Sequence, residues 1–345
     1  MGRSRPPLII FLGDEQGCET YAGAGFRERG HTMILTVTLN PAMDRLLFVD
    51  GFQFNVTNRI YRRENCVGGK GTHVSANLAC LGEPSIATGI AMGPTGQQIM
   101  ESLSEFGVQC DFVYSDEGDS RTNYVLLDGK NSTLICERGP EVPAAVLEAF
   151  SRKYDALLSR AQYVVISGDA SNFAYREGFS LQDSMLDAAR RKGVRVVLDS
   201  AGASLASGVK RKPYLIKPNA EELAELTGMP TDNDEQILAA MASLDEYGIE
   251  IIAVSMGSRG SIVKYGDEYY RAGIAKVEAQ NTVGCGDAYL SGLVYAIKHD
   301  YPALPALVLA AACGGAAAMS PLSVGFDKQA AMSLKDRIEI TKLER

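Results

Sequence analysis

A glycine-rich turn that ends in an acidic residue, Gly284-Cys285-Gly286-Asp287, is the segment of this sequence best suited to chemistry. Small and apolar residues follow from 288 to 296 and predict a helix that begins at the turn. The unpaired N–H groups and the dipole at a helix N-terminus attract anionic oxygens. An aspartate there would repel a bound phosphate unless it accepts a proton from a hydroxyl that attacks the phosphate. A plain N-cap aspartate after a glycine turn is the alternative that this segment alone leaves open.

Two segments near the start of the chain could bind a polar ligand. Residues 38–44 follow the first predicted strand, and Asp44 at their end could bind sugar hydroxyls or stand as a solvated turn carboxylate. Gly69 and Lys70 belong to a glycine-rich turn, 68–72, which would offer backbone N–H groups and one ammonium ahead of a helix. The lysine lies between glycines, so the spacing is not that of a Walker A loop, and a purely structural turn is the other interpretation.

Two segments later in the chain also allow two interpretations. Asn219 holds the position of a helix N-cap, with Lys217 before it and Glu222 after it at capping-box spacing. The same amide and carboxylate could orient the waters of a phosphate-bound magnesium ion, which usually keeps several waters. Ser255 and Gly257 lie in a glycine turn between two strands. A nucleotide could approach the backbone closely there, or the turn could be an ordinary one.

The elements that must position these residues alternate between strands and helices from residue 33 onward. Strands are predicted at 34–39, 85–91, 163–167, 195–198, 214–216, 251–255 and 261–264. Helices are predicted at 72–81, 97–106, 144–161, 181–192, 220–227, 235–247, 287–297 and 303–318. Several strands are apolar throughout, as expected when helices cover both faces of a sheet. The repeated order predicts an α/β fold with a doubly wound, mostly parallel sheet, whose ligands collect at the carboxyl ends of the strands.

Two regions interrupt this order and predict a small β-sheet lid. Residues 46–61 and 121–136 have the alternating pattern of short strands separated by turns. Apolar residues along 46–54 would leave an exposed edge of the lid prone to association. We therefore expect two lids to pair in a homodimer.

One main domain is predicted, at residues 33–330. Residues 1–32 are rich in glycine, arginine and proline and show no clear periodicity, so a poorly structured extension is expected, with Met33 as a natural start. Residues 331–345 are expected to form a C-terminal tail.

Composition argues against several classes of function. The net charge is −8, so no basic surface for nucleic acid or for an anionic membrane is expected. No apolar run approaches the roughly 20 residues of a membrane span. The 7 cysteines show no C-x-x-C pairing and the 3 histidines are far apart in the sequence. These features predict reduced thiols in a cytoplasmic protein and argue against a zinc site.

Four motifs stand out in chain order: T-L-N-P-A-M-D (38–44), G-G-K-G (68–71), K-P-N-A-E-E (217–222) and N-T-V-G-C-G-D (281–287). Together they resemble those of the phosphofructokinase-B (ribokinase-like) carbohydrate kinases over residues 33–325, above all the 1-phosphofructokinase and tagatose-6-phosphate kinase branch. The resemblance implies a magnesium-dependent kinase that uses ATP to convert a hexose phosphate, first of all fructose 1-phosphate, to a bisphosphate. Alternative acceptors are tagatose 6-phosphate, fructose 6-phosphate, an unphosphorylated sugar or a nucleoside. A catalytically silent sugar-binding protein is the other class of function.

The resemblance also implies roles for single residues. Asp287 would be the catalytic base, and the backbone N–H groups of Gly284, Cys285 and Gly286 would form the anion hole for the transferring phosphoryl group. Residues on the substrate side would be Asp44, Gly69, Lys70, His73, Asp169 and two lid arginines, Arg59 and Arg121, which would hold the sugar's existing phosphate. Residues on the ATP side would be Lys217, Asn219, Glu222, Ser255, Gly257 and Thr282, of which Asn219 and Glu222 would reach magnesium through water.

Three residues depart from the usual pattern of that family. His73 stands where an asparagine is expected and replaces a sugar-binding amide by a bulkier, titratable ring. Asp169 stands where a serine lies near the sugar phosphate. Unit charges about 4 Å apart repel by about 4 kcal/mol at an effective dielectric near 20, so Asp169 either turns away or marks a different substrate. Cys285 replaces an alanine, as a small tolerated residue or as a reactive thiol at a helix N-terminus.

Overall fold

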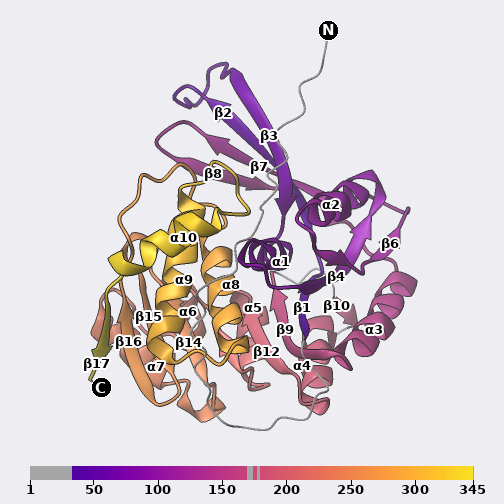
Figure 1. Ribbon diagram of the computed structural model, residues 1–345. Helices are drawn as coiled ribbons and strands as arrows, with labels where there is room; N and C mark the ends of the chain where they lie inside the picture. The colour runs from indigo at the N-terminus through magenta and orange to yellow at the C-terminus, as the bar shows by residue number, and fades with distance from the viewer. Residues whose placement is uncertain (1–32, 169–173, 177–178, 345) are drawn as a thin grey trace. The chain divides into compact units, whose positions relative to one another are not determined.

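A mixed β-sheet lies at the centre of the described part of the chain (Figure 1). The computed structural model describes residues 33–168, 174–176 and 179–344. The expectations for residues 1–32 and for Asp169 therefore fall outside the described residues. Among the helices of the described ranges, none is long and apolar enough to cross a membrane.

The strands of the main sheet are β1 (Met33–Thr38), β4 (Ser85–Met92), β5 (Gln109–Cys110), β6 (Val113–Ser115), β9 (Ala161–Ser167), β12 (Arg195–Asp199), β13 (Leu215–Ile216), β14 (Ile251–Ser255), β15 (Ser261–Tyr265), β16 (Glu268–Ala272) and β17 (Ile340–Leu343). Their order is β17-β16-β15-β14-β13-β12-β9-β1-β4-β5, with β6 beside β4. The strands from β14 to β5 run parallel, whereas β15, β16 and β17 pair antiparallel. The predicted α/β fold with a mostly parallel sheet is confirmed. A separate short pair joins β10 (Ala174–Arg176) to β11 (Phe179–Ser180).

Helices cover both faces of the sheet. One face carries α3 (Ala144–Leu158), α4 (Leu181–Arg191), α5 (Gly202–Val209), α6 (Ala220–Thr227) and α7 (Asp234–Ala242). The other carries α1 (Lys70–Leu81), α8 (Cys285–Lys298), α9 (Ala303–Ala318) and α10 (Lys328–Leu334). Short 3-10 turns lie at η2 (Asp245–Tyr247), η3 (Gly257–Arg259) and η4 (Lys335–Arg337). Successive side chains of a strand point to opposite faces, so Ile34 packs in one apolar core and Leu35 in the other.

Asp287 lies on α8, and the packing of α8 against α9 fixes the position of that helix. Small residues dominate α9, and α8 contributes Gly292 to the contact. A Cβ at Gly292 would lie 2.9 Å from Cα of Ala310, which is closer than packed atoms approach. The glycine therefore lets the two helices come together and holds the N-terminus of α8 at the edge of the sheet.

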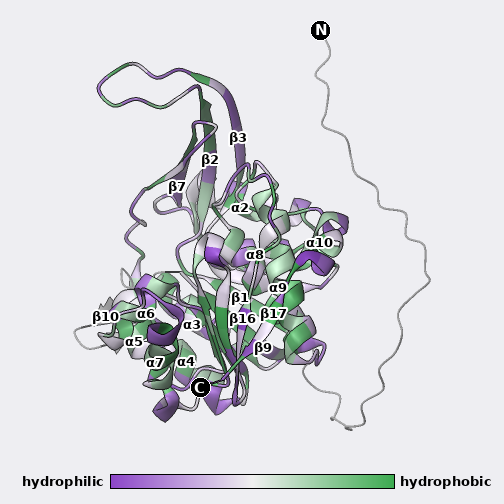
Figure 2. Cartoon of the chain, turned by 90° about the vertical axis from the view of Figure 1, so that its left-hand side faces the viewer, coloured by the Kyte–Doolittle hydropathy of each residue, from purple (hydrophilic) through white to green (hydrophobic). Residues whose placement is uncertain are grey.

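The predicted small β-sheet lid is present and stands apart from the helical layers (Figures 1 and 2). Its strands are β2 (Ala42–Val49), β3 (Ile60–Gly68), β7 (Arg121–Leu127) and β8 (Ser132–Cys136), in the order β3-β2-β7-β8. Within the region predicted at 46–61, residues 50–59 connect β2 to β3. Beneath the lid, α2 (Gly93–Glu105) shares a third apolar core with the lid strands. Because β3 continues to Gly68, the lid leads directly into α1.

The C-terminal residues differ from the tail expected at 331–345. The segment completes α10, forms η4 and then adds β17 to the main sheet. Ile340 pairs with Ala272 and Leu343 with Tyr269 of β16. Without β17, the outward-facing backbone N–H and C=O groups of β16 would form an unpaired sheet edge, and β17 supplies their hydrogen-bond partners.

Candidate active site

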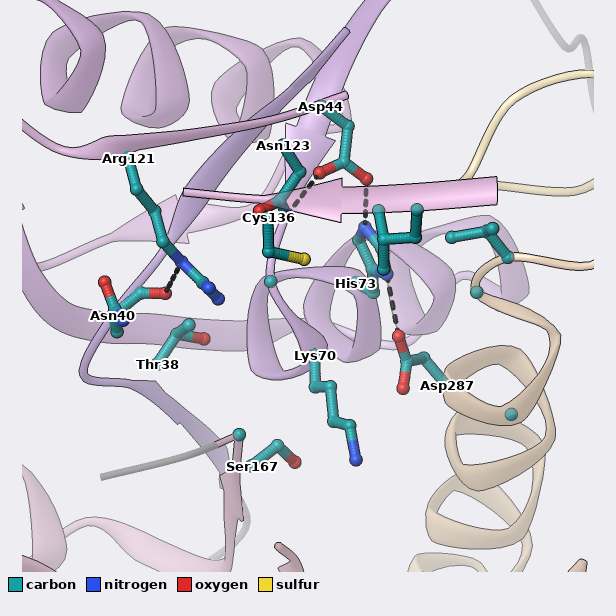
Figure 3. Close-up of a pocket in the computed structure, with 16 residues that line it drawn as sticks. Thr38, Asn40, Asp44, Lys70, His73, Arg121, Asn123, Cys136, Ser167 and Asp287 are labelled. Atoms are coloured by element: carbon teal, nitrogen blue, oxygen red, sulfur yellow. Dashed lines mark hydrogen bonds and ion pairs between the residues drawn. The ribbon is translucent and has the colours of Figure 1, made fainter. Parts of the chain in front are cut away.

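A cavity of about 330 Å³ lies between the lid and the carboxyl ends of β1 and β9. Eight residues predicted to act on the sugar or the phosphoryl group line it: Asp44, Gly69, Lys70, His73, Arg121, Gly284, Gly286 and Asp287 (Figure 3). The structure adds Thr38, Asn40, Asn123, Leu134, Cys136, Ser167, Gly168 and Val283 to the lining. The place of the cavity agrees with the rule that α/β sheets bind ligands at the carboxyl ends of their strands.

The glycine turn takes the backbone conformation expected for an anion-binding helix start. Gly284 is the N-cap of α8, with φ of 84°, in the left-handed region that favours glycine. A Cβ at that position would lie 1.9 Å from the carbonyl oxygen of Ser323, so no other residue fits. Asp287 follows in the first turn of α8 and is buried. Cys285 donates a long backbone hydrogen bond, 3.4 Å, to the oxygen of Thr282.

A buried network joins Asp287 to Asp44 through the ring of His73 (Figure 3). Nδ1 of His73 lies 2.7 Å from Oδ2 of Asp287, and Nε2 lies 3.6 Å from Oδ2 of Asp44. Burial disfavours the charged ring, but the neighbouring carboxylates of Asp287 and Asp44 outweigh this effect and raise the pKa of His73 to about 10. The sequence predicted that His73 faces the substrate, yet both of its ring nitrogens are engaged by protein groups.

Asp44 is held by side chains that lie far away in the sequence. Asn123 on β7 donates a 2.9 Å hydrogen bond to Oδ1, and Ser323 donates a 2.6 Å hydrogen bond to Oδ2. The neighbouring strand β3 needs a glycine at position 68, since a Cβ there would lie 1.9 Å from Oδ1 of Asp44. Asn123 and Ser323 were missed by sequence reasoning, and no local pattern marks Ser323.

Two lysines converge on one buried carboxylate that the sequence did not single out. Nζ of Lys70 lies 3.3 Å, and Nζ of Lys217 3.4 Å, from Oδ1 of Asp199. Asp199 raises the pKa of Lys70 above its usual value, and the two ammonium groups lower the pKa of Asp199 despite its burial. Asp199 and Ser167 both end parallel strands, so the rule on strand ends was a signal that could have found them.

None of the six residues predicted for ATP is in the lining of the cavity. Asn219 and Glu222 form a capping box at the start of α6, and Asn219 bridges to Ser255 at the end of β14. Gly257 begins η3 with φ of 57°. A Cβ on Gly286 would lie 3.6 Å from Nζ of Lys217, so this lysine connects the predicted ATP side to the glycine turn.

The donor set here fits a magnesium ion carried by a nucleotide better than a resident metal ion. Within the described ranges, no group of three or more His, Cys, Asp or Glu could hold a metal ion. Oε2 of Glu222 accepts the hydrogen bond of the capping box, and Oε1 of the same carboxylate takes no part in that bond. Oδ2 of Asp199 is buried without a hydrogen-bond partner among the described residues. Both oxygens are acceptors of the kind that the waters of a hydrated magnesium ion contact.

The two lid arginines do not lie together in this chain. Arg121 lines the cavity, where its Nε donates a 3.2 Å hydrogen bond to the carbonyl oxygen of Asn40. Arg59 lies on the connection between β2 and β3, is exposed and does not line the cavity. A role for Arg59 in binding the substrate's phosphate stays a prediction.

The thiol of Cys285 does not have the chemistry of a reactive cysteine. Burial, with a smaller effect of Asp287, raises its pKa to about 11. A neutral thiol is a poor nucleophile, so Cys285 is best described as a small residue tolerated in the turn. Gly168, which precedes Asp169, lines the cavity and donates a 2.9 Å hydrogen bond to the carbonyl oxygen of Asp199.

Comparison with known proteins agrees with this geometry. The model of the pfkB family carbohydrate kinases matches residues 33–325. A Thermotoga maritima protein named a possible 1-phosphofructokinase is 30% identical, with a TM-score of 0.81, over 90% of this chain and 100% of that one. A Staphylococcus aureus protein assigned as a phosphofructokinase is 27% identical, with a TM-score of 0.73, over 90% of this chain and 99% of that one. Phosphofructokinase-2 from Escherichia coli, in complex with fructose-6-phosphate, is 19% identical over 88% of this chain and 98% of that one, and its TM-score of 0.77 shows a shared fold.

The chain therefore belongs to the pfkB family of carbohydrate kinases. Its class of activity is that of a carbohydrate kinase.

Proposed function

We propose that this protein transfers the γ-phosphoryl group of ATP to a hydroxyl of a hexose phosphate, with fructose 1-phosphate as the first candidate. The observation that carries the proposal is the position of Asp287. It is a buried carboxylate in the first turn of α8, next to a glycine turn and in the lining of a cavity that also contains an ammonium group, Lys70. Tagatose 6-phosphate, fructose 6-phosphate and unphosphorylated sugars are the competing acceptors.

The reaction follows from positioning and charge. The acceptor hydroxyl gives its proton to Asp287 while its oxygen bonds to the γ-phosphorus of ATP, and the bond from that phosphorus to the ADP oxygen breaks. The N–H groups of Gly284 and Gly286 and the ammonium of Lys217 stabilise the negative charge that develops on the phosphoryl oxygens. Asp44, held by Asn123 and Ser323, binds hydroxyls of the sugar and so orients the acceptor.

Magnesium would enter with ATP, held through water by Glu222 and Asn219, and would neutralise phosphate charge. The rest of the nucleotide would extend along Ser255, Gly257 and Thr282. Ser255 lies beside Asn219 through a backbone bridge, so this position is continuous with the capping box.

The existing phosphate of the sugar would bind at Arg121. This arginine, on the lid strand β7, lines the cavity, and a guanidinium can pair with phosphate in bidentate geometry. The volume of about 330 Å³ is at the small end of the range for ligand sites and suits one sugar phosphate.

The assay that tests the proposal measures the rate of ADP formation with each candidate acceptor in turn: fructose 1-phosphate, fructose 6-phosphate, tagatose 6-phosphate, fructose and ribose. A phosphosugar is expected to give the highest kcat/KM, and turnover of fructose or ribose alone would overturn this substrate class.

We also infer a homodimer formed through the lid, in the cytoplasm. Apolar side chains stand in solvent along the lid and its connection: Phe54 is 82% exposed, Tyr61 63% and Ile60 51%. Such a patch at a sheet edge favours pairing with a second copy. Ile60→Arg is expected to shift sedimentation toward the monomer, whereas Ile274→Arg, at an exposed residue outside the lid strands, should leave the mass unchanged. A monomeric wild type would contradict the inference.

A further inference from the structure

The buried ring of His73, on α1, uses both of its nitrogens within the protein (Figure 3). Nδ1 lies 2.7 Å from Oδ2 of Asp287, and Nε2 lies 3.1 Å from the carbonyl oxygen of Val67. Nε2 also lies 3.6 Å from Oδ2 of Asp44. A residue that replaced a sugar-binding asparagine would be expected to direct a nitrogen at the sugar, but here the ring connects one side of the site to the other.

The hydrogen-bond partners fix where the protons lie. The carbonyl oxygen of Val67 can only accept, so Nε2 of His73 must carry a hydrogen. The contact of 2.7 Å between Nδ1 and Oδ2 of Asp287 then needs one further proton, on either the ring or the carboxyl group. When this proton is on the ring, Asp287 is a carboxylate and its Oδ2 is occupied by the bond to Nδ1. Oδ1, the other oxygen of Asp287, is then left to receive a proton from an acceptor hydroxyl.

We propose that His73 is a positioning residue for phosphoryl transfer. It holds Asp287 by Oδ2 so that Oδ1 takes the hydroxyl proton, and it ties this carboxyl group to Asp44, which orients the acceptor. The proposal rests on the proposed kinase function, since it assumes that Asp287 is the base. The two ends of the reaction, acceptor binding and proton removal, are thereby set by one side chain.

The charges around the ring are consistent with a cationic link. Asp44 faces it from β2 and Asp287 from α8, while Lys70 lies one turn earlier on the same helix. The thiol of Cys66, on β3, bonds to Ser323 in the same network, and burial raises its pKa to about 11, so it is neutral. Two carboxylates therefore face one ring, and the imidazolium form balances one of them.

Two substitutions separate the two ends of the link. His73→Asn places an uncharged amide donor near the position of Nδ1, and His73→Gln places one near Nε2. In His73→Gln the bond to Asp287 is lost, and kcat should fall at least tenfold with KM for ATP unchanged. In His73→Asn the bond can persist without the positive charge. The acid limb of the pH profile of kcat/KM should then rise by roughly one to three units, the usual effect of an opposite charge at this range.

The matched control is His299→Asn, because His299 pairs with Glu83 and lies outside the cavity lining. It should keep the wild-type profile. A purely structural role for His73 would change stability but not the acid limb, so kcat within twofold and an unmoved limb in both His73 variants would overturn the proposal. If the variants fail to fold, nitrogen-15 NMR of the wild-type ring decides instead: both ring nitrogens protonated at pH 8 are expected, and a neutral ring would overturn it. Absence of kinase activity in the wild type would sink the proposed function itself, which is a different result.

Discussion

Asp199→Asn is expected to destabilise the protein strongly, because it removes the buried charge that two lysines share. The side chain of Asp199 is 0% exposed, while those of Lys217 and Lys70 are 7% and 39% exposed. At the 3.4 Å that separates Lys217 from Asp199, unit charges attract by roughly 5 kcal/mol at an effective dielectric near 20, before the cost of desolvation. Water screens Lys70 more, so the pair with Lys217 contributes most.

Removing one partner of a buried ion pair usually costs about 3–5 kcal/mol, because the other charge stays buried and unpaired. With about 2–4 °C in Tm per kcal/mol for a domain of this size, calorimetry at pH 7 should show Tm lower by roughly 6–20 °C. Asp155→Asn is the matched control, since Asp155 pairs with Lys192 at the surface, where the side chains are 59% and 30% exposed. That change should cost less than about 1 kcal/mol. A Tm for Asp199→Asn within about 2 °C of the control would refute the reasoning.

The pH dependence of stability tests the same charge in a second way. The pKa of Asp199 is lowered in the folded protein by Lys217 and Lys70, against the effect of burial. Its contribution is therefore present above the unfolded pKa of about 3.9 and is lost as pH falls through the folded value. Below about pH 5 the wild type should lose stability more steeply than Asp199→Asn. Equal slopes in acid would show that the ion pairs do not stabilise the fold.

Three further predictions concern the reaction. Asp287→Asn keeps the size of the base but not its proton acceptance, so kcat should fall by roughly 10²–10⁴ with KM for ATP little changed; a wild-type rate would show that Asp287 is not the base. Arg121→Ala should raise KM for the sugar phosphate about 10- to 100-fold, as the loss of a charged hydrogen bond of roughly 1.5–3 kcal/mol implies, and an equal rise for ATP would place Arg121 elsewhere. Gly284→Ala should lower kcat more than tenfold, because its Cβ would meet the carbonyl oxygen of Ser323 at 1.9 Å. Gly266→Ala controls for backbone strain alone, since its φ is 62° and its nearest contact is 3.7 Å.

The regular elements could be predicted because their signals are local. The helices at Ala220–Thr227 and Ala303–Ala318 and the strand at Ile251–Ser255 have the predicted boundaries, since hydrophobic period and capping residues lie within each segment. The helix α5 was missed because its sequence is poor in long apolar side chains. Strand β17 was missed because its order comes from pairing with β16 rather than from its own pattern.

The residues of the candidate site also differ in how far they could be predicted. Asp287 and Asp44 could be predicted because each lies in a local motif, next to a glycine turn or a proline turn, that indicates ligand binding. Ser323, which donates a hydrogen bond to Asp44 across 279 residues of sequence, could not, since only the fold brings the two together. The position of Arg59 could not be predicted from the sequence either, because it depends on the path of the connection between β2 and β3.

The strand pair β2–β3 carries the outer hairpin of the lid at one end and Asp44, the proposed acceptor-binding residue, at the other. Asp44 faces Cys66 across the ladder, and β3 ends at Gly68, one residue before the N-cap of α1. In the proposed mechanism, a movement of the hairpin would shift Asp44 relative to His73 and, through the ring, relative to Asp287. With the lid displaced, the two carboxyl groups would leave the arrangement that the proposed reaction needs. We therefore expect hydrolysis of ATP in the absence of sugar to be much slower than sugar phosphorylation. The reason is that one continuous strand pair joins the lid to the proposed site.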